Sequence, residues 1–236
     1  MAYSSSIEWT DATWNPITGC SKISDGCKHC YAERLSKRLK AMGSQKYING
    51  FEVTTHKEVL SEPLMWKKPR NVFVNSMSDT FHENISDEYI LEMFKVMNNA
   101  AHHKFQVLTK RSSRLLDLNK RINWTNNIWL GVTVEDSNSL FRIKDLKKTG
   151  AIVKFISFEP LLDNLKKLNL DGIHWVIVGG ESGAGARIME KEWVDTIFHE
   201  AREKKIPFFF KQWGGVNKKK KGRLYNGQEY SEYPIF

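Results

Sequence analysis

The sequence has few cysteines and lacks any long apolar segment. Only three cysteines occur in 236 residues, which excludes a small extracellular fold held together by several disulfides. No stretch approaches the roughly 18 consecutive apolar residues that a membrane-spanning helix needs. Residues 1–10 also lack the apolar core of a secretory signal peptide. These absences predict a cytoplasmic protein that does not enter the membrane.

Length and composition predict the size of the fold. A chain of 236 residues with 41% hydrophobic residues is long enough to build one sizeable α/β core. No stretch has the length and composition of a linker between two domains. We therefore expect a single domain over residues 1–236.

The three cysteines lie within eleven positions, as Cys20, Cys27 and Cys30. The C-x-x-C pair brings two thiolates close enough to share one metal centre, and the preceding Ser/Asp/Gly loop lets the third reach it. A 4Fe-4S cluster held by three cysteines would leave one iron open to a small molecule. Zinc would need a fourth ligand, and thiols without metal are a third interpretation. Candidates for that fourth ligand are His29, His56 and His82.

Positive charge is concentrated near the end of the chain. Of the formal net charge of +9, residues 200–223 contribute nine Lys or Arg against Glu200 and Glu203, with the densest run at Lys218–Lys221. Such a segment attracts a polyanion and releases its counterions. The basic segment 200–223 therefore predicts nucleic-acid binding, with a solvated surface loop as the alternative.

From residue 71 onward, short β-branched or aromatic runs alternate with amphipathic helical segments. Predicted strands are 71–75, 105–109, 128–134, 152–158, 174–178 and 207–211, with a further strand just before Cys20. Predicted helices are 31–42, 87–101, 112–119, 137–149 and 190–204, with a weaker candidate at 161–168. The alternation predicts the α/β class, as a partial or full TIM-like (β/α) barrel of about six to seven parallel strands. A doubly wound open sheet is the alternative.

Polar residues cluster where five predicted strands end, at 75–79, 109–111, 133–136, 157–159 and 179–183. Parallel sheets bind ligands at this edge, so the pattern predicts a site, although some of these residues also fit helix caps. Glu159 and Glu181 are candidates for substrate contact or proton transfer. Gly179 and Gly180 permit close backbone approach to a cofactor or substrate, or form only a tight turn.

A cysteine triplet that enters a helix, followed by a string of βα units, resembles the radical S-adenosylmethionine superfamily. Motifs between Trp14 and Trp213 are similar to a phage-associated three-cysteine-motif family of unknown role. These motifs are WNPITGC at 14–20, CKHCYAE at 27–33, FEP at 158–160, GGESG at 179–183 and FFKQWG at 209–214. The superfamily spacing is commonly C-x-x-x-C-x-x-C, whereas here six residues separate Cys20 from Cys27.

The resemblance implies cofactors and roles for particular residues. It implies a 4Fe-4S cluster on Cys20, Cys27 and Cys30 whose open iron binds S-adenosylmethionine. An electron from a donor protein would then cleave the cofactor to a 5′-deoxyadenosyl radical. The resemblance implies that Tyr31 and His29 lie near the cluster or the adenine of the cofactor. Ser76, Ser78 and Asp79 would lie near its methionyl amine, in a loop that lacks the usual Gly-Gly-Glu. Thr133 and Glu135 would contact its ribose, and Lys110 or Arg142 its carboxylate.

Three functions follow from these observations. The leading one is a radical S-adenosylmethionine enzyme acting on a nucleic acid or nucleotide-like substrate. The second is a zinc-stabilised nucleic-acid-binding protein without catalysis. The third is a cluster-binding, non-catalytic protein of a phage or defence system, which the missing Gly-Gly-Glu favours.

Overall fold

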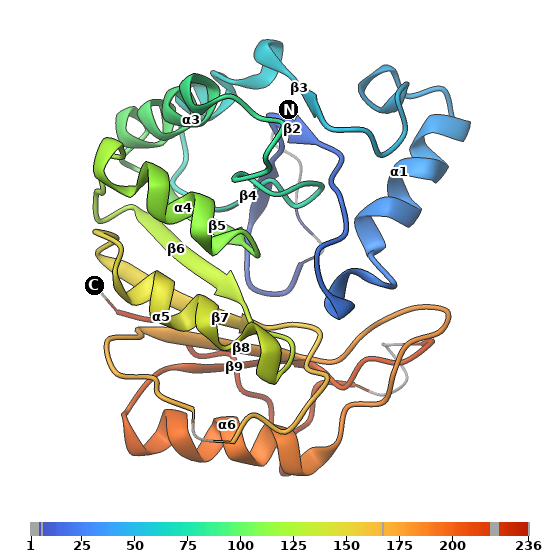
Figure 1. The fold of residues 1–236 in the computed structure, drawn as a ribbon, viewed down its shortest axis with the longest axis vertical. Coiled ribbons are helices and arrows are strands. Elements are labelled where there is room, and N and C mark those ends of the chain that lie inside the picture. Colours follow the sequence, from blue (N-terminus) through green and yellow to red (C-terminus); the bar gives the residue numbers. More distant parts are fainter. Residues whose placement is uncertain (1–4, 6, 167, 218–221, 236) are drawn as a thin grey trace. The chain divides into compact units, whose positions relative to one another are not determined.

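The fold is α/β, with seven parallel strands and helices between them (Figure 1). The computed structural model describes residues 5, 7–166, 168–217 and 222–235. The strands follow the order β1-β4-β5-β6-β7-β8-β9, and β2 and β3 form a separate two-stranded sheet. This confirms the prediction of a partial TIM-like (β/α) barrel.

The elements of the described residues have the following bounds. The strands are β1 (Ala12–Trp14), β2 (Ile17–Thr18), β3 (Thr54–Thr55), β4 (Asn71–Val74), β5 (Lys104–Thr109), β6 (Ile128–Thr133), β7 (Val153–Phe158), β8 (Trp175–Gly179) and β9 (Phe208–Gln212). The α-helices are α1 (Tyr31–Ala41), α2 (Glu62–Met65), α3 (Asp87–Asn99), α4 (Ser112–Leu118), α5 (Phe141–Lys147) and α6 (Lys191–Glu203). Short 3₁₀ turns are η1 (Asp25–Cys27), η2 (Gln45–Tyr47), η3 (Lys57–Val59), η4 (Asn119–Arg121) and η5 (Ser137–Ser139). None of these helices combines the length and apolarity required to cross a bilayer.

The chain folds into two compact units. The N-terminal unit comprises Met1–Lys22, Cys30–Leu130 and Lys148–Val153, and the C-terminal unit comprises Ile23–His29, Gly131–Lys147 and Lys154–Phe236. Strand β6 passes from the first unit into the second. The expectation of a single domain over residues 1–236 stays a prediction.

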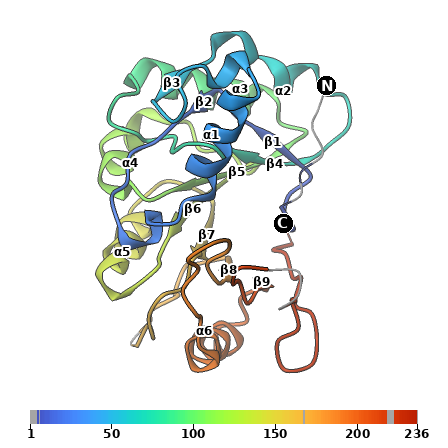
Figure 2. The same cartoon turned by 90° about the vertical axis from the view of Figure 1, so that its right-hand side faces the viewer.

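In the N-terminal unit, β1, β4 and β5 pair in parallel. Ala12 is in register with Val72, and Val72 with Phe105. The Phe105 amide donates to the Asn127 carbonyl at 2.7 Å, where the ladder to β6 begins. Val72, Val74, Phe105 and Val107 are fully buried, as expected for parallel strands covered on both faces. Figure 2 shows β1, β4 and β5 side by side.

Helix α3 illustrates how the sequence specifies a helix of this unit. The Ser86 side chain accepts a hydrogen bond from the Tyr89 amide, and Asp87 and Glu88 occupy the first turn. This cap satisfies an otherwise unpaired amide, and the two acids complement the helix dipole. The apolar side chains then repeat at helical spacing and are buried. These buried residues are Tyr89, Ile90, Met93, Phe94, Val96 and Met97.

The C-terminal unit continues the same sheet. The Val134 amide donates to the Ser157 carbonyl at 3.0 Å. Strands β7 and β8 pair in parallel, as do β8 and β9, with an irregularity between Val178 and Gly179. Helix α6 packs on β9, since the ring centroids of Phe198 and Phe208 are 5.1 Å apart (Figure 1).

The prediction of a helix at 161–168 is wrong. The described residues of this segment contain no helix. The amides of Leu161 and Leu162 donate instead to the carbonyls of Gly179 at 3.0 Å and Glu135 at 2.8 Å. Because these amides bind neighbouring strand ends, the backbone here connects the sheet rather than forming helical hydrogen bonds.

The close approach of β6 and β7 generates a stability prediction. A Cβ on Gly131 would lie 2.5 Å from the Phe155 ring, closer than side-chain carbons pack. Gly131→Ala should therefore destabilise the protein by about 1–3 kcal/mol through overpacking, measured by urea unfolding. The same substitution should cost less in a Phe155→Leu background, where the ring is removed. An equal cost in both backgrounds would contradict the packing account.

Candidate functional site

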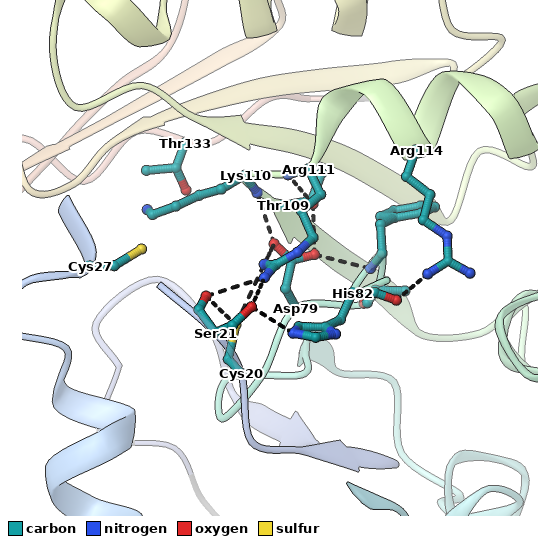
Figure 3. A network of polar contacts seen from close by, with 12 residues as sticks. Cys20, Ser21, Cys27, Asp79, His82, Thr109, Lys110, Arg111, Arg114 and Thr133 are labelled. Carbon is teal, nitrogen blue, oxygen red and sulfur yellow. Dashed lines mark hydrogen bonds and ion pairs between the residues drawn. The ribbon is translucent and has the colours of Figure 1, made fainter. Parts of the chain in front are cut away.

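Asp79, after the end of β4, is the centre of a buried polar network in the N-terminal unit (Figure 3). One carboxylate oxygen accepts from the Thr109 hydroxyl at 2.7 Å and the Phe81 amide at 3.0 Å. The other oxygen accepts from the Lys110 amide at 3.0 Å and from Arg111 at 3.3 Å. Four donors therefore surround a carboxylate that is 5% exposed. This arrangement explains how a buried charge is stabilised at a strand end.

Arg111 links this network to the first cysteine. Its Nη1 lies 3.5 Å from Cys20 Sγ, its Nη2 donates to the Ser21 hydroxyl at 2.8 Å, and its Nε contacts both Glu83 oxygens at 3.0 Å (Figure 3). Burial opposes its charge, but the negative charges of Asp79, Cys20 and Glu83 raise the pKa of Arg111. A permanent cation thus faces the Cys20 sulfur, an environment that favours a thiolate.

Sequence reasoning did not identify Arg111 as a partner of Cys20. It recognised only that residues 109–111 form a polar strand end. The contact joins positions 91 residues apart, and neither spacing nor composition carries a signal for it. The pairing of β4 with β5 brings the end of β5 beside the loop that follows β4, and a bridge between Gly19 and Ser78 brings Cys20 to the same loop.

The three cysteines form no disulfide within the described residues and have intermediate exposure. Cys30 is the residue immediately before α1, and its side chain makes no capping hydrogen bond to that helix. Cys27 ends η1, and its sulfur lies 3.6 Å from the Ser24 hydroxyl. Cys20 and Cys30 belong to the N-terminal unit and Cys27 to the C-terminal unit. The donor chemistry fits a cluster with three thiolate ligands.

No metal-ligand cluster is assembled in the part of the chain that the structure describes: no three His, Cys, Asp or Glu side chains are grouped to hold an ion. The assignment of Cys20, Cys27 and Cys30 as metal ligands therefore stays a prediction.

Two histidines that could complete a zinc site already use both ring nitrogens. His56 contacts the Thr18 hydroxyl at 2.8 Å and Glu58 at 3.3 Å. His82 contacts the Ser21 hydroxyl at 2.9 Å and accepts from the Asn84 amide at 3.1 Å. Zinc would have to displace one of these contacts, because each ring nitrogen offers one bonding position. The observed contacts therefore disfavour His56 and His82 as zinc ligands.

In the C-terminal unit, Glu135 follows β6 and anchors the loop that precedes Cys27. The Glu135 side chain is fully buried and pairs with Arg142 at 2.6 Å, while the Ser24 hydroxyl donates to its other oxygen. Arg142 also donates to the Thr133 carbonyl at 2.8 Å. Both carboxylate oxygens of Glu135 thus have partners. Arg142 Nε is buried and has no hydrogen-bond partner among the described residues.

Glu159 lies after β7 in a second polar group of this unit. Its Oε1 is 3.0 Å from Lys211 Nζ, and its Oε2 accepts from the Ser157 hydroxyl at 3.0 Å. A Cβ on Gly179 would lie 2.7 Å from the same carboxylate, so glycine at this position leaves room for it. Lys211 occupies the irregularity of β9, since Phe210 is in register with Val178 but Gln212 with Gly179. Sequence reasoning missed Lys211 because it was part of a predicted strand.

Glu181, also predicted as catalytic, forms a paired fork with Arg187. Nε and the backbone amide of Arg187 each donate to one oxygen at 2.9 Å, and Nη2 donates to the other at 2.6 Å. Burial by itself would raise the pKa of Glu181, but the hydrogen bonds from Arg187 outweigh it and lower that pKa. Gly180 packs against backbone, since a Cβ there would lie 2.2 Å from the Trp213 carbonyl oxygen.

The remaining predicted site residues lie in the N-terminal unit. The Tyr31 hydroxyl donates to the Ser76 carbonyl. The hydroxyls of Ser76 and Ser78 donate to Asn15 Oδ1 at 3.1 Å and to the Ile17 carbonyl at 3.0 Å. The Lys110 ammonium has no ion-pair partner within the described part of the chain. Their proposed contacts with a cofactor stay predictions.

The Glu181–Arg187 pair predicts a pH-dependent loss of stability. The pair stabilises the folded state above the ordinary glutamate pKa of 4.5, and this stabilisation is lost as the pH falls from there through the lowered pKa of Glu181. Arg187→Ala should therefore lower the free energy of unfolding by about 1–3 kcal/mol at pH 7, because a buried carboxylate loses its partner. At about pH 3.5 the difference should become smaller. Urea unfolding at both pH values tests this, and an equal loss at both would contradict it.

Solved structures of spore photoproduct lyase have a fold similar to that of this chain. The chain resembles spore photoproduct lyase complexed with dinucleoside spore photoproduct, with a TM-score of 0.50 and 11% identity over 86% of this chain and 64% of that chain. A mutant of that enzyme with bound AdoMet and dinucleoside spore photoproduct gives a TM-score of 0.49 and 10% identity over the same shares. At such identities the likeness is one of fold, and the chain spans about two thirds of the length of these enzymes.

No curated protein matches the chain. A family model described as "Protein of unknown function (DUF5131)" matches residues 4–234, almost the whole sequence. The chain therefore belongs to this family.

Proposed function

We propose that the protein is a radical S-adenosylmethionine enzyme in which Cys20, Cys27 and Cys30 hold a 4Fe-4S cluster. The observation that carries this proposal is the set of three partly exposed cysteines without a disulfide, the last of them immediately before α1. They occur in a fold shared with spore photoproduct lyase, a radical S-adenosylmethionine enzyme. No disulfide uses them, and their number and softness suit iron-sulfur ligation.

The chemistry belongs to the cofactors, and the residues position them. When bound, the cluster would supply one electron to S-adenosylmethionine, whose carbon–sulfur bond breaks to give a 5′-deoxyadenosyl radical. Residues 20–30, which carry the three cysteines, are called the cysteine loop. Arg111 fixes the start of this loop through Cys20 and Ser21. Glu135 fixes its middle through Ser24. Helix α1 begins directly after Cys30.

Two predicted cofactor contacts take a different role in this proposal. The Asp79 carboxylate accepts four hydrogen bonds and the Glu135 carboxylate is engaged on both oxygens. Both are therefore assigned as positioning residues. Arg142 Nε and the Lys110 ammonium remain the candidates for the cofactor carboxylate, with Ser76, Ser78, Thr133, Tyr31, Gly179 and Gly180 as its other proposed contacts.

The proposed substrate is a nucleic acid or a nucleotide-like molecule. The support is the fold of spore photoproduct lyase, whose structure holds a dinucleoside spore photoproduct, and the basic segment 200–223. Within that segment Arg202, Lys204 and Lys211 form ion pairs with Glu232, Asp171 and Glu159. The nucleic-acid role thus depends mainly on Lys218–Lys221, which lie outside the described residues. A cytoplasmic location and a phage association remain expectations from the sequence.

Cluster assembly tests the ligand assignment. Cys27→Ala should lose most of its iron after anaerobic reconstitution, because two thiolates do not hold a cubane cluster stably. Iron content and the visible absorption spectrum provide the measurement, and circular dichroism checks that the variant is folded. Full iron content in the variant would refute this ligand set. One zinc per colourless wild-type chain would support the zinc-stabilised alternative instead.

Cofactor cleavage tests the activity itself. Reconstituted wild-type protein incubated with dithionite and S-adenosylmethionine should release 5′-deoxyadenosine, measured by liquid chromatography. A full cluster without this product would support the non-catalytic alternative.

Salt dependence tests the proposed nucleic-acid partner. Changing Lys218–Lys221 to Gln should weaken binding of single-stranded DNA and reduce the slope of log affinity against log salt by roughly 0.7 for each lost phosphate contact. Changing the exposed Lys67 and Lys68 of the other unit to Gln provides a control. An unchanged slope would assign the lysine run to a solvated loop.

A further inference from the structure

We propose that the exposed face of α1 is the docking surface for an acidic protein that carries one electron. This inference rests on the proposed function, because a cluster must be reduced before it can cleave S-adenosylmethionine. It adds the place and the chemical nature of the reductant.

The face is a stripe of three apolar side chains and one arginine, and it is exposed within the part of the chain that the structure describes. Tyr31, Leu35, Arg38 and Met42 follow one another at spacings of four, three and four residues, which places them on one side of the helix. Tyr31 is 47% exposed, Leu35 39% and Met42 69%. Only Ala32 and Ser36 of α1 are buried. Exposed apolar residues grouped on one side of a helix are typical of an interaction surface.

Arg34 and Arg38 make the stripe and its edge basic, because each is three or four positions from its apolar residues, whereas Lys37 and Lys40 lie farther round the helix. Helix α1 carries Arg34, Lys37, Arg38 and Lys40 against the single acid Glu33. Glu33 is paired with Lys37 at 2.8 Å and with Lys22 at 2.9 Å. An apolar centre with a charged rim is the usual anatomy of a protein interface, and a basic rim is complementary to an acidic partner.

The position of α1, directly after Cys30, suggests that the partner delivers an electron to the proposed cluster. Cys30 is the residue immediately before α1, and Tyr31 is both the first residue of the helix and the start of the stripe. Figures 1 and 2 show α1 on the outside of the N-terminal unit. A protein that covers the stripe would therefore lie beside a proposed cluster ligand.

The composition of the stripe favours a protein over a nucleic acid. Single-stranded nucleic acids bind basic grooves in which successive aromatic rings stack on the bases. Tyr31 is the only aromatic residue of α1, and Leu35 and Met42 offer no ring for stacking. A short stripe also matches the small, weak interfaces of electron-transfer encounters.

The test compares two routes of reduction in the reconstituted protein. An acidic plant-type ferredoxin or flavodoxin, kept reduced, should support release of 5′-deoxyadenosine at low salt. Arg38→Glu should slow this route roughly tenfold, because reversing a rim charge mainly lowers the association rate. Leu35→Gln should slow it several-fold. Both variants should match wild type when dithionite is the reductant, since a small molecule needs no docking surface.

A charge-matched control and a binding measurement complete the test. Lys95→Glu makes the same change on the exposed side of α3, in the same unit, and should leave both routes unchanged. Oxidised ferredoxin should also bind unreconstituted wild-type protein about tenfold more tightly than the Arg38→Glu variant at low salt, measured by calorimetry.

The outcomes separate the two proposals. If dithionite yields no 5′-deoxyadenosine with wild-type protein, the proposed function fails whatever the carriers do. If dithionite works but Arg38→Glu behaves like Lys95→Glu with both carriers, the docking surface is wrong. If Arg38→Glu weakens binding of a labelled single-stranded DNA and leaves the carrier route unchanged, the stripe is a nucleic-acid surface and the inference is overturned.

Discussion

The buried guanidinium of Arg111 determines how the first cysteine is presented. It is held by Asp79 and Glu83, and it faces Cys20 Sγ at 3.5 Å. A buried arginine is stable only when its donors are matched by acceptors, and here the acceptors come from the loop after β4 and from Cys20 and Ser21. The ends of β4 and β5 therefore fix the position of a residue more than fifty positions earlier in the chain.

A second buried ion pair, between Glu135 and Arg142, performs a comparable task in the C-terminal unit. Glu135 follows β6 and pairs with Arg142, and it also accepts a hydrogen bond from the hydroxyl of Ser24, which lies three residues before Cys27. In both cases a polar strand end restrains the cysteine loop rather than remaining free for a ligand. This explains why a longer first spacing than the superfamily's is compatible with an ordered loop: the extra residues have partners of their own.

The sequence predicted the strands well because each is a short apolar run that parallel pairing buries on both faces. Strands β4 to β9 lie within a residue or two of their predicted bounds. It failed at 161–168, where apolar spacing suggested a helix but the amides of Leu161 and Leu162 bind neighbouring strand ends. The candidate site was also predicted only in part. Local spacing identified the cysteines and the polar strand ends as candidates. It did not reveal the Arg111 contact with Cys20 or the Lys211 contact with Glu159, because both depend on which strands are neighbours.

The central claim is that three thiolates hold a cluster whose fourth iron is open to S-adenosylmethionine. Electron paramagnetic resonance of the anaerobically reconstituted, reduced protein tests it most directly. The account predicts the signal of a reduced 4Fe-4S cluster, and a change in that signal when S-adenosylmethionine is added, because the cofactor would bind the open iron. A cluster signal that the cofactor leaves unchanged, or the absence of any cluster signal, would contradict the account.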